Sequence, residues 1–151
     1  MGKGLFIPME VKKSFLLWLL AIAAGVFEMA IAVTEEAVSG AGIQAGLFIA
    51  VGIRIVIYAV LVWITVQMFR GRNGARIALA ILLGGIGMAS LIYDPIEWLA
   101  QGNSLANAFD GTTVYSILFA VSRIVHISAV ILAVIFMFRP AANRYYRSVS
   151  H

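Results

Sequence analysis

The chain has 151 residues, of which 62% are hydrophobic and 12% are charged, and its mean hydropathy is +0.99. Soluble domains contain about 45–50% apolar and about 25% charged residues, so this composition excludes an ordinary soluble protein and indicates an integral membrane protein. The formal net charge is +4, but the basic residues lie in short clusters at the ends of apolar runs, which argues against nucleic-acid binding.

Four apolar runs are long enough to cross a hydrocarbon core about 30 Å thick, which takes about 20 helical residues. We therefore predict an all-α, transmembrane four-helix bundle in a single membrane domain, residues 1–151, with spans at 15–33, 47–69, 77–93 and 114–138. Lys12 and Lys13 precede the first span as they would in a signal peptide, with small residues at Ala21 and Ala23. The apolar run continues well past Ala23, which favours an uncleaved first helix.

Lysine and arginine outside the spans occur in three segments. These residues are Lys3, Lys12 and Lys13 before the first span, Arg70, Arg72 and Arg76 between the second and third, and Arg139, Arg144 and Arg147 after the fourth. The other two connections carry Glu35, Glu36, Asp94, Glu97 and Asp110. Because cytoplasmic segments are enriched in Lys and Arg, both termini are predicted to be cytoplasmic and both acidic loops to lie outside.

Two connections have recognisable turn chemistry. Residues 70–76 are rich in Gly and Asn, so the second and third spans are predicted to be antiparallel neighbours. In the second outer loop, Asp94-Pro95 is typical of an N-cap followed by proline at the first helical position. We predict a short interfacial helix there, broken at 102–104, with a further turn at 105–109 and a cap for the fourth span at 110–113. This loop is interpreted either as an interfacial anchor or as a lid.

Charged residues interrupt three of the spans. The polar cluster that we predict consists of Glu28, Arg54, Tyr58, Ser122, Arg123 and His126. At 100° per residue, each charge lies on a helical stripe of small or polar residues, as expected of a face turned inward. A charge in a span costs roughly 2.5–3.5 kcal/mol on insertion scales, so such side chains usually pair. We predict that Glu28 pairs with Arg54, with Arg123 or with both, in the outer half of the bundle.

Two interpretations of this cluster are open. In the structural one, an ion pair fixes the helix register, and His126 is a neutral imidazole hydrogen-bonded to Ser122 or to a backbone carbonyl. In the functional one, two arginines facing one carboxylate attract an anion, a lipid headgroup or a partner's carboxylate, while His126 and Glu28 relay protons. No cofactor is predicted: the spans offer His126 no second histidine for haem or metal, and the sequence has no cysteine ligands.

The segments Lys12-Lys13-Ser14-Phe15, 71–76 and Phe138-Arg139-Pro140 resemble those of small uncharacterised four-span bacterial membrane proteins. The resemblance covers nearly the whole chain and implies a multi-pass protein of the bacterial plasma membrane, with no catalytic residue and no substrate carried over. We expect a non-enzymatic accessory or interaction component that contacts the lipid bilayer and a protein partner or a second copy of the chain. The alternative is a small transporter or channel-like conduit for protons, an anion or a lipid headgroup.

Overall fold

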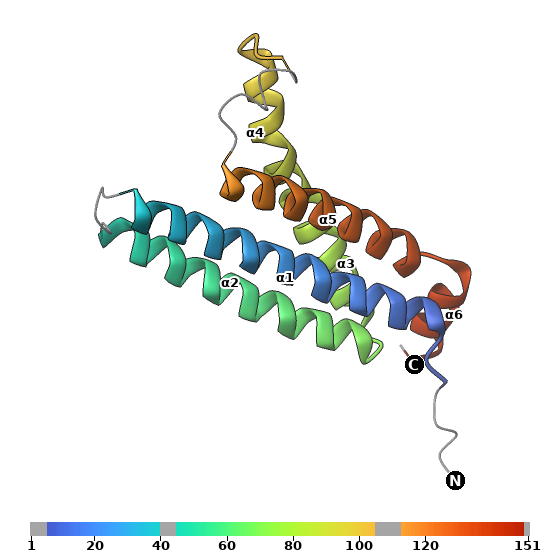
Figure 1. The fold of residues 1–151 in the computed structure, drawn as a ribbon. Coiled ribbons are helices and arrows are strands. Elements are labelled where there is room, and N and C mark those ends of the chain that lie inside the picture. The colour runs from blue at the N-terminus through green and yellow to red at the C-terminus, as the bar shows by residue number, and fades with distance from the viewer. Residues whose placement is uncertain (1–5, 40–44, 105–112, 150–151) are drawn as a thin grey trace.

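The computed structural model describes residues 6–39, 45–104 and 113–149, and every regular element within them is helical (Figure 1). The elements are α1 (Met9–Val38), α2 (Ala45–Phe69), α3 (Asn73–Ile81), the π-helical η1 (Leu82–Gly87), α4 (Met88–Ala100), α5 (Val114–Met137) and α6 (Pro140–Val149). Because α3, η1 and α4 run on without a break, four helices are long and apolar enough to cross a membrane. The predicted helical bundle of a multi-pass membrane protein is confirmed.

The helices extend beyond the predicted spans. α1 has 30 residues, which corresponds to about 45 Å of helix, and it continues past the predicted end at residue 33 to Val38. The hydropathy pattern marks only the part of a helix that lies in hydrocarbon. Glu35 and Glu36 are good helix formers, so the helix continues through them after the apolar run has ended.

The prediction of a separate helix starting at Asp94-Pro95 is wrong in its start. α4 passes through Pro95, so Asp94 lies inside a helix and is not an N-cap. The predicted break is confirmed, since α4 ends at Ala100 and Gly102 adopts a φ of +87°. Residues 105–112 lie outside the described residues, but Thr113 caps α5 by accepting a hydrogen bond from the Ser116 N–H at 3.2 Å. Whether residues 94–100 lie at the membrane interface stays a prediction.

A short helix that the sequence reasoning missed, α6, follows the last span. Pro140 is its first residue, a position at which proline needs no N–H donor. Tyr145 and Tyr146 are buried, and the Tyr145 hydroxyl donates to the Phe69 carbonyl at 3.2 Å. α6 is thereby attached to the turn between α2 and α3.

The Arg76 guanidinium binds in the same region. It donates to the side-chain oxygen of Asn143 and lies 4.3 Å from the ring centroid of Phe138 and 4.7 Å from that of Tyr146. These contacts connect the first turn of α3 to α6. We therefore assign Arg76 a structural role at this end of the bundle.

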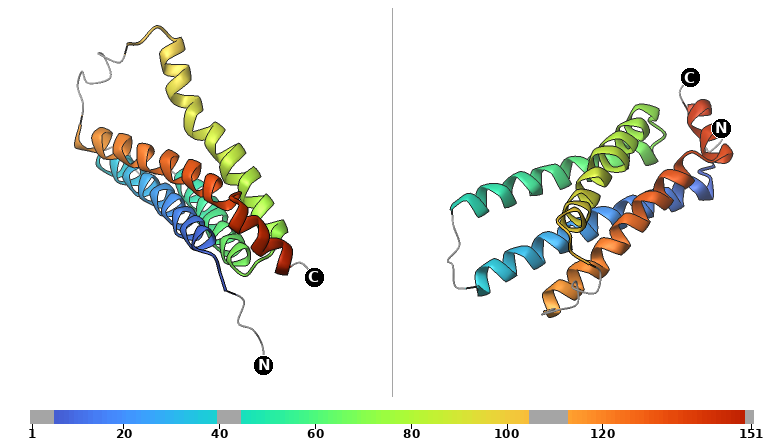
Figure 2. Two further views of the ribbon diagram at one scale, coloured as in Figure 1. Left: turned by 90° about the vertical axis from the view of Figure 1, so that its right-hand side faces the viewer. Right: turned by 90° about the horizontal axis from the view of Figure 1, so that it is seen from above.

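The helices pack unevenly. α1 packs most extensively against α5 and next against α2, whereas α4 makes few contacts with α5. Figure 2 shows the continuous α3–η1–α4 helix diverging from the other helices towards the end of α4. The buried core, which includes Trp18, Met68, Leu79 and Met137, lies at the opposite end, and there the Ser14 hydroxyl donates to the Ala133 carbonyl at 3.0 Å. One end of the bundle is therefore closed by a core and the other is open.

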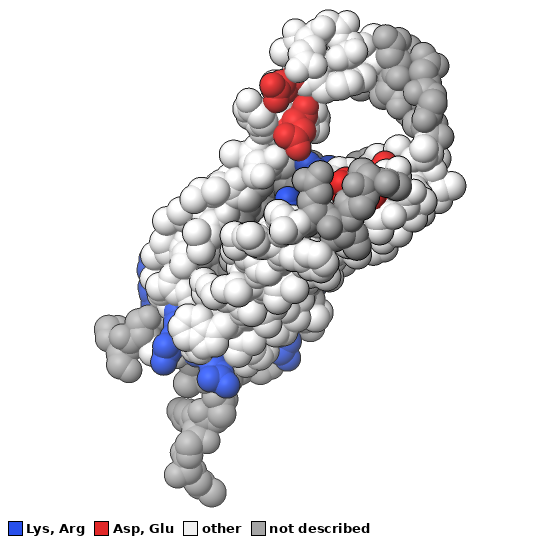
Figure 3. All heavy atoms as spheres, turned by 90° about the vertical axis from the view of Figure 1, so that its left-hand side faces the viewer, with Lys and Arg blue, Asp and Glu red and all other residues white. Residues whose placement is uncertain are grey.

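The two ends also differ in charge. We call one end the basic end, defined by Lys12, Lys13, Arg70, Arg72, Arg76, Arg139, Arg144 and Arg147. The acidic end is defined by Glu35, Glu36, Asp94 and Glu97. Figure 3 shows basic atoms gathered at the closed end, and both acidic and basic atoms towards the other end of the molecule. The charge separation read from the sequence is thus reproduced along the bundle axis.

Candidate functional site

A cleft of about 750 Å³ lies between α1, α2 and α5 on one side and η1 and α4 on the other. It exists because α4 diverges from the bundle, as Figure 2 shows. Its ionisable and hydroxyl-bearing lining residues are Glu28, Arg54, Tyr58, Ser90, Asp94, Arg123 and His126. Five of the six residues predicted for the polar cluster therefore line one cleft, and the sixth, Ser122, is buried beside it.

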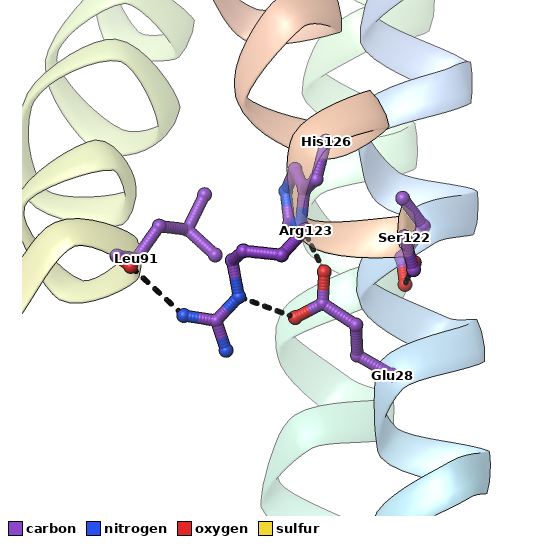
Figure 4. A network of polar contacts seen from close by, with 6 residues as sticks. Glu28, Leu91, Ser122, Arg123 and His126 are labelled. Atoms are coloured by element: carbon purple, nitrogen blue, oxygen red, sulfur yellow. Dashed lines mark hydrogen bonds and ion pairs between the residues drawn. The ribbon is translucent and has the colours of Figure 1, made fainter. Parts of the chain in front are cut away.

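Glu28 is the centre of an ion-pair network between α1 and α5 (Figure 4). Its Oε2 lies 3.2 Å from Nε of Arg123, and its Oε1 lies 3.2 Å from Nδ1 of His126. The side chain is only 9% exposed, so both contacts are shielded from solvent. The predicted pairing of Glu28 with Arg123 is confirmed.

Arg123 also reaches α4. Its Nη1 donates a hydrogen bond to the Leu91 carbonyl at 2.9 Å, and its guanidinium carbon lies 4.7 Å from the ring centroid of Phe119. The contact of its Nε with Glu28 is ionic, because the N–H is not aligned for a hydrogen bond. Arg123 thus connects three helices, and its charge is balanced by a carboxylate, a carbonyl and an aromatic ring.

His126 contacts Glu28, the partner that the functional interpretation gives it, and not Ser122 or a backbone carbonyl as in the structural interpretation. The Ser122 hydroxyl is directed instead towards the Ala24 carbonyl, at 3.4 Å. A carboxylate only accepts hydrogen bonds, so an ionised Glu28 requires the proton of His126 on Nδ1. The imidazole is therefore oriented by the charge on α1.

Gly25 allows Tyr58 of α2 and His126 of α5 to lie close to α1. A Cβ atom at Gly25 would lie 3.1 Å from the Tyr58 hydroxyl oxygen and 3.4 Å from Cε1 of His126. Both distances are short for such contacts, so any larger side chain would displace Tyr58 or His126. The missing side chain of Gly25 places the Tyr58 ring against α1, with Arg54 one turn away on the same face of α2.

Arg54 differs from Arg123 in having no carboxylate partner among the described residues. Its side chain is exposed to the cleft, and no Asp or Glu oxygen in the described ranges lies within 4.0 Å of it. Of the two arginines predicted as partners of Glu28, Arg54 does not pair with it, and Arg123 and His126 contact its two oxygens across the tight α1–α5 contact.

The small-residue stripe of α2, which includes Gly46 and Ala50, is not packed against another helix in its first half, which corrects a second expectation. Gly46 and Ala50 are exposed, whereas the buried residues of α2 are Leu61, Thr65, Gln67 and Met68 in its second half. Small residues allow helices to approach but do not require it. Here α2 diverges from close contact, and Arg54 is left in the cleft.

Sequence reasoning missed the contribution of α4. Asp94 and Ser90 line the cleft, and Leu91 supplies the carbonyl that binds Arg123. The pair Asp94-Pro95 predicts a helix start in the outer loop, and this places Asp94 outside the spans. A helix continued through Pro95 would have placed Ser90 and Asp94 four residues apart on one face, so the periodicity contained the signal.

The cleft therefore contains the ion-pair network of Glu28, Arg123 and His126. It also contains Arg54, which has no carboxylate partner among the described residues. Within the described ranges, no group of three His, Asp or Glu side chains is placed to hold a metal ion. Comparison with models of known protein families, with curated proteins and with solved structures found no match for this chain. The geometry of the cleft is the basis of the function proposed below.

Proposed function

We propose that this membrane protein is a non-enzymatic binding protein that takes up an anionic group in the cleft, with Arg54 as the principal ligand-binding residue. The observation that carries the proposal is the exposed guanidinium of Arg54 in the cleft, without a carboxylate partner among the described residues. Arg54 is nine residues from the start of α2, or about 14 Å along the helix. A charge at membrane depth is costly unless protein, water or a ligand compensates it.

The ion-pair network supports the assignment of Arg54 as the ligand-binding residue, because the network does not include Arg54. Glu28 is contacted by Arg123 at one oxygen and by His126 at the other, and it has no ion pair with Arg54. We assign the network a structural role, as one of the two sequence interpretations has it. The second interpretation, an arginine in excess that attracts an anion, then applies to Arg54 alone.

Two hydroxyl groups complete the proposed anion site. Tyr58 lies one turn after Arg54 on α2, and Ser90 lies on the opposite wall of the cleft. Each hydroxyl is a hydrogen-bond donor, and an anion such as a phosphate accepts from both hydroxyl and guanidinium groups. The site thus offers charge from one wall and hydrogen bonds from both.

The orientation is part of the proposal. We place the basic end in the cytoplasm of a bacterial cell and the open end of the cleft on the outer side of the plasma membrane. The concentration of Lys and Arg at one end of the bundle supports this, since cytoplasmic ends are enriched in both.

A thermal melting experiment tests the binding proposal. The full-length protein in phosphatidylcholine nanodiscs is titrated with decyl phosphate, an anionic amphiphile. A ligand at one hundred times its dissociation constant stabilises the folded state by about 2.7 kcal/mol, so the melting temperature should rise by several degrees.

Arg54→Gln should abolish that rise, whereas the control Arg72→Gln, an exposed arginine in the α2–α3 turn, should retain it. An equal rise in the wild type and in Arg54→Gln would overturn the proposal.

A proton conduit is the second candidate, favoured by the 3.2 Å contact between His126 and Glu28 at the wall of the cleft. Proton flux into liposomes, followed with an internal pH-sensitive dye, should then depend on His126 and not on Arg54. Glu28→Gln and His126→Gln are the informative variants, and Arg54→Gln is the control. A wild-type flux equal to that of empty liposomes excludes this candidate.

A further inference from the structure

We infer that the ligand of the cleft is a phospholipid with a primary-ammonium headgroup, held by Arg54 at its phosphate and by Asp94 at its ammonium. This inference rests on the proposed function and specifies the ligand. Asp94 lines the same cleft as Arg54, and no Lys, Arg or His in the described ranges lies within 4.0 Å of its carboxylate. Within the described ranges, the cleft therefore presents one charge of each sign that has no ion-pair partner.

The apolar lining of the cleft indicates a ligand with acyl chains. Val56, Ile57 and Val60 of α2 face Leu82 and Ile86 of η1 across the cleft. These five side chains are 39–64% exposed, so the cleft opens through the apolar surface of the helices. At membrane depth such an opening meets lipid chains rather than water.

On both walls of the cleft, the polar lining residues lie nearer the acidic end than the apolar lining residues. On α2, Arg54 lies nearer the acidic end than Val60, which is six residues or about 9 Å further along. On the opposite wall, Asp94 lies nearer the acidic end than Ile86 of η1. A lipid of the leaflet at the acidic end has this order, with its headgroup above its chains.

The headgroup position of Asp94 favours an ammonium group over a second anion. Leu91 lies at the level of the ion-pair network through its bond to Arg123, and Asp94 is about 4.5 Å further along α4. In an ethanolamine phospholipid the ammonium lies beyond the phosphate, on the side away from the chains. We therefore place the chains against the apolar lining, the phosphate at Arg54 and the ammonium at Asp94, all of which line the same cleft.

Competitive lipid retention tests the inference. The full-length protein is reconstituted in phosphatidylcholine nanodiscs containing equal fractions of phosphatidylethanolamine and phosphatidylglycerol, then extracted in mild detergent, and the co-purified lipids are quantified by mass spectrometry. We expect the wild type to retain phosphatidylethanolamine about tenfold over phosphatidylglycerol, the size expected for a hydrogen bond between charged groups.

Two variants separate the headgroup contacts. Arg54→Gln should lose retention of both lipids, and Asp94→Asn should lose only the preference for phosphatidylethanolamine. Glu97→Gln on α4, an exposed acid outside the cleft lining, is the control and should retain lipid like the wild type. A wild-type preference that survives Asp94→Asn, or no preference in the wild type, would overturn the inference.

A water-soluble compound with the same phosphate and ammonium groups is the alternative to a phospholipid ligand. If O-phosphoethanolamine raises the melting temperature in pure phosphatidylcholine nanodiscs as much as phosphatidylethanolamine does, the ligand is water-soluble and the lipid inference fails. An Arg54-dependent response to decyl phosphate would leave the anion-binding proposal standing in that case. Loss of that response as well would remove both.

Discussion

Arg123 donates a hydrogen bond at 2.9 Å to the carbonyl of Leu91, which is the carbonyl that Pro95 leaves without a helical donor. Leu91 precedes Pro95 by four residues, and proline has no N–H to donate. An unpaired carbonyl in hydrocarbon costs several kcal/mol, so the arginine compensates for the proline. α4 therefore continues through Pro95. The Arg123 guanidinium is engaged by the Leu91 carbonyl that Pro95 leaves without a donor. Arg54 is left as the arginine available to a ligand.

Replacing Pro95 by alanine should weaken the dependence of stability on Arg123. The variant Pro95→Ala restores an N–H for the Leu91 carbonyl, so the hydrogen bond from Arg123 is no longer required. We expect the cost of Arg123→Met to fall by about 1 kcal/mol in the Pro95→Ala background. Equilibrium unfolding in mixed micelles of dodecyl maltoside and sodium dodecyl sulfate, followed by far-UV circular dichroism, measures the cycle. The same cost in both backgrounds would contradict the relationship between these two residues.

Arg123 and Arg54 should differ in their contribution to stability. Arg123→Met leaves Glu28 with one partner in a shielded environment, and breaking a buried pair costs about 3 kcal/mol or more. Arg54→Met removes an exposed side chain without a described ion pair and should change the unfolding free energy by less than about 0.5 kcal/mol.

The double variant Glu28→Gln with Arg123→Met provides the internal check. The double variant should lose less unfolding free energy than the sum of the losses of the two single variants. Each single variant leaves one charge of the pair without its partner, and the double variant removes both charges. The same unfolding measurement applies. Equal costs for Arg54→Met and Arg123→Met would show that the ion-pair network is not structural.

Tyr146 should make stability fall at alkaline pH. Burial raises the pKa of its hydroxyl well above the usual value near 10, although the nearby Arg76 opposes this in part. The unfolded chain therefore ionises first, so the stability from the neutral phenol is present below about pH 10 and is lost as pH rises beyond it. The melting temperature of the wild type should fall more steeply above pH 10 than that of Tyr146→Phe.

The phenylalanine keeps a ring for the Arg76 guanidinium, so the two proteins should melt within a few degrees of each other at pH 8. Parallel melting curves from pH 8 to pH 11 would show that ionisation of Tyr146 is not linked to unfolding.

The proposed orientation predicts which residues are accessible from outside an intact cell. The chain has no cysteine, so Ser39→Cys at the end of α1 and Ser148→Cys in α6 each introduce a single thiol. A membrane-impermeant maleimide should label the first variant in intact cells and the second only after permeabilisation. The reverse pattern would invert the topology and place the open end of the cleft in the cytoplasm.

Hydropathy was sufficient to predict the four helices, because the length of an apolar run reports whether it spans a bilayer. It did not predict the continuity of α4, because the donor that makes Pro95 tolerable comes from Arg123, 32 residues beyond Leu91. Hydropathy does not predict α6, although Pro140 is a typical first helical residue, because the apolar run ends before Arg139.

The pairing of Glu28 with Arg123 was predictable from helical stripes and depth, because both residues are obliged to find partners in a span. The choice between Arg123 and Arg54 was not, since it depends on α1 packing more tightly against α5 than against α2. Asp94 lines the cleft because α4 continues through Pro95, and this continuity depends on a tertiary contact. The expected protein partner or second copy of the chain stays a prediction.

The most direct measurement of the central claim is the contact between Arg54 and the phosphate of a bound ligand. Protein labelled with ¹⁵N-arginine, in phosphatidylethanolamine-containing nanodiscs, is examined by solid-state NMR for dipolar coupling between guanidinium ¹⁵N and lipid ³¹P. We predict one phosphorus-coupled arginine signal that Arg54→Gln removes and Arg72→Gln leaves in place. Survival of every coupled signal in Arg54→Gln, or no coupled signal in the wild type, would contradict the account.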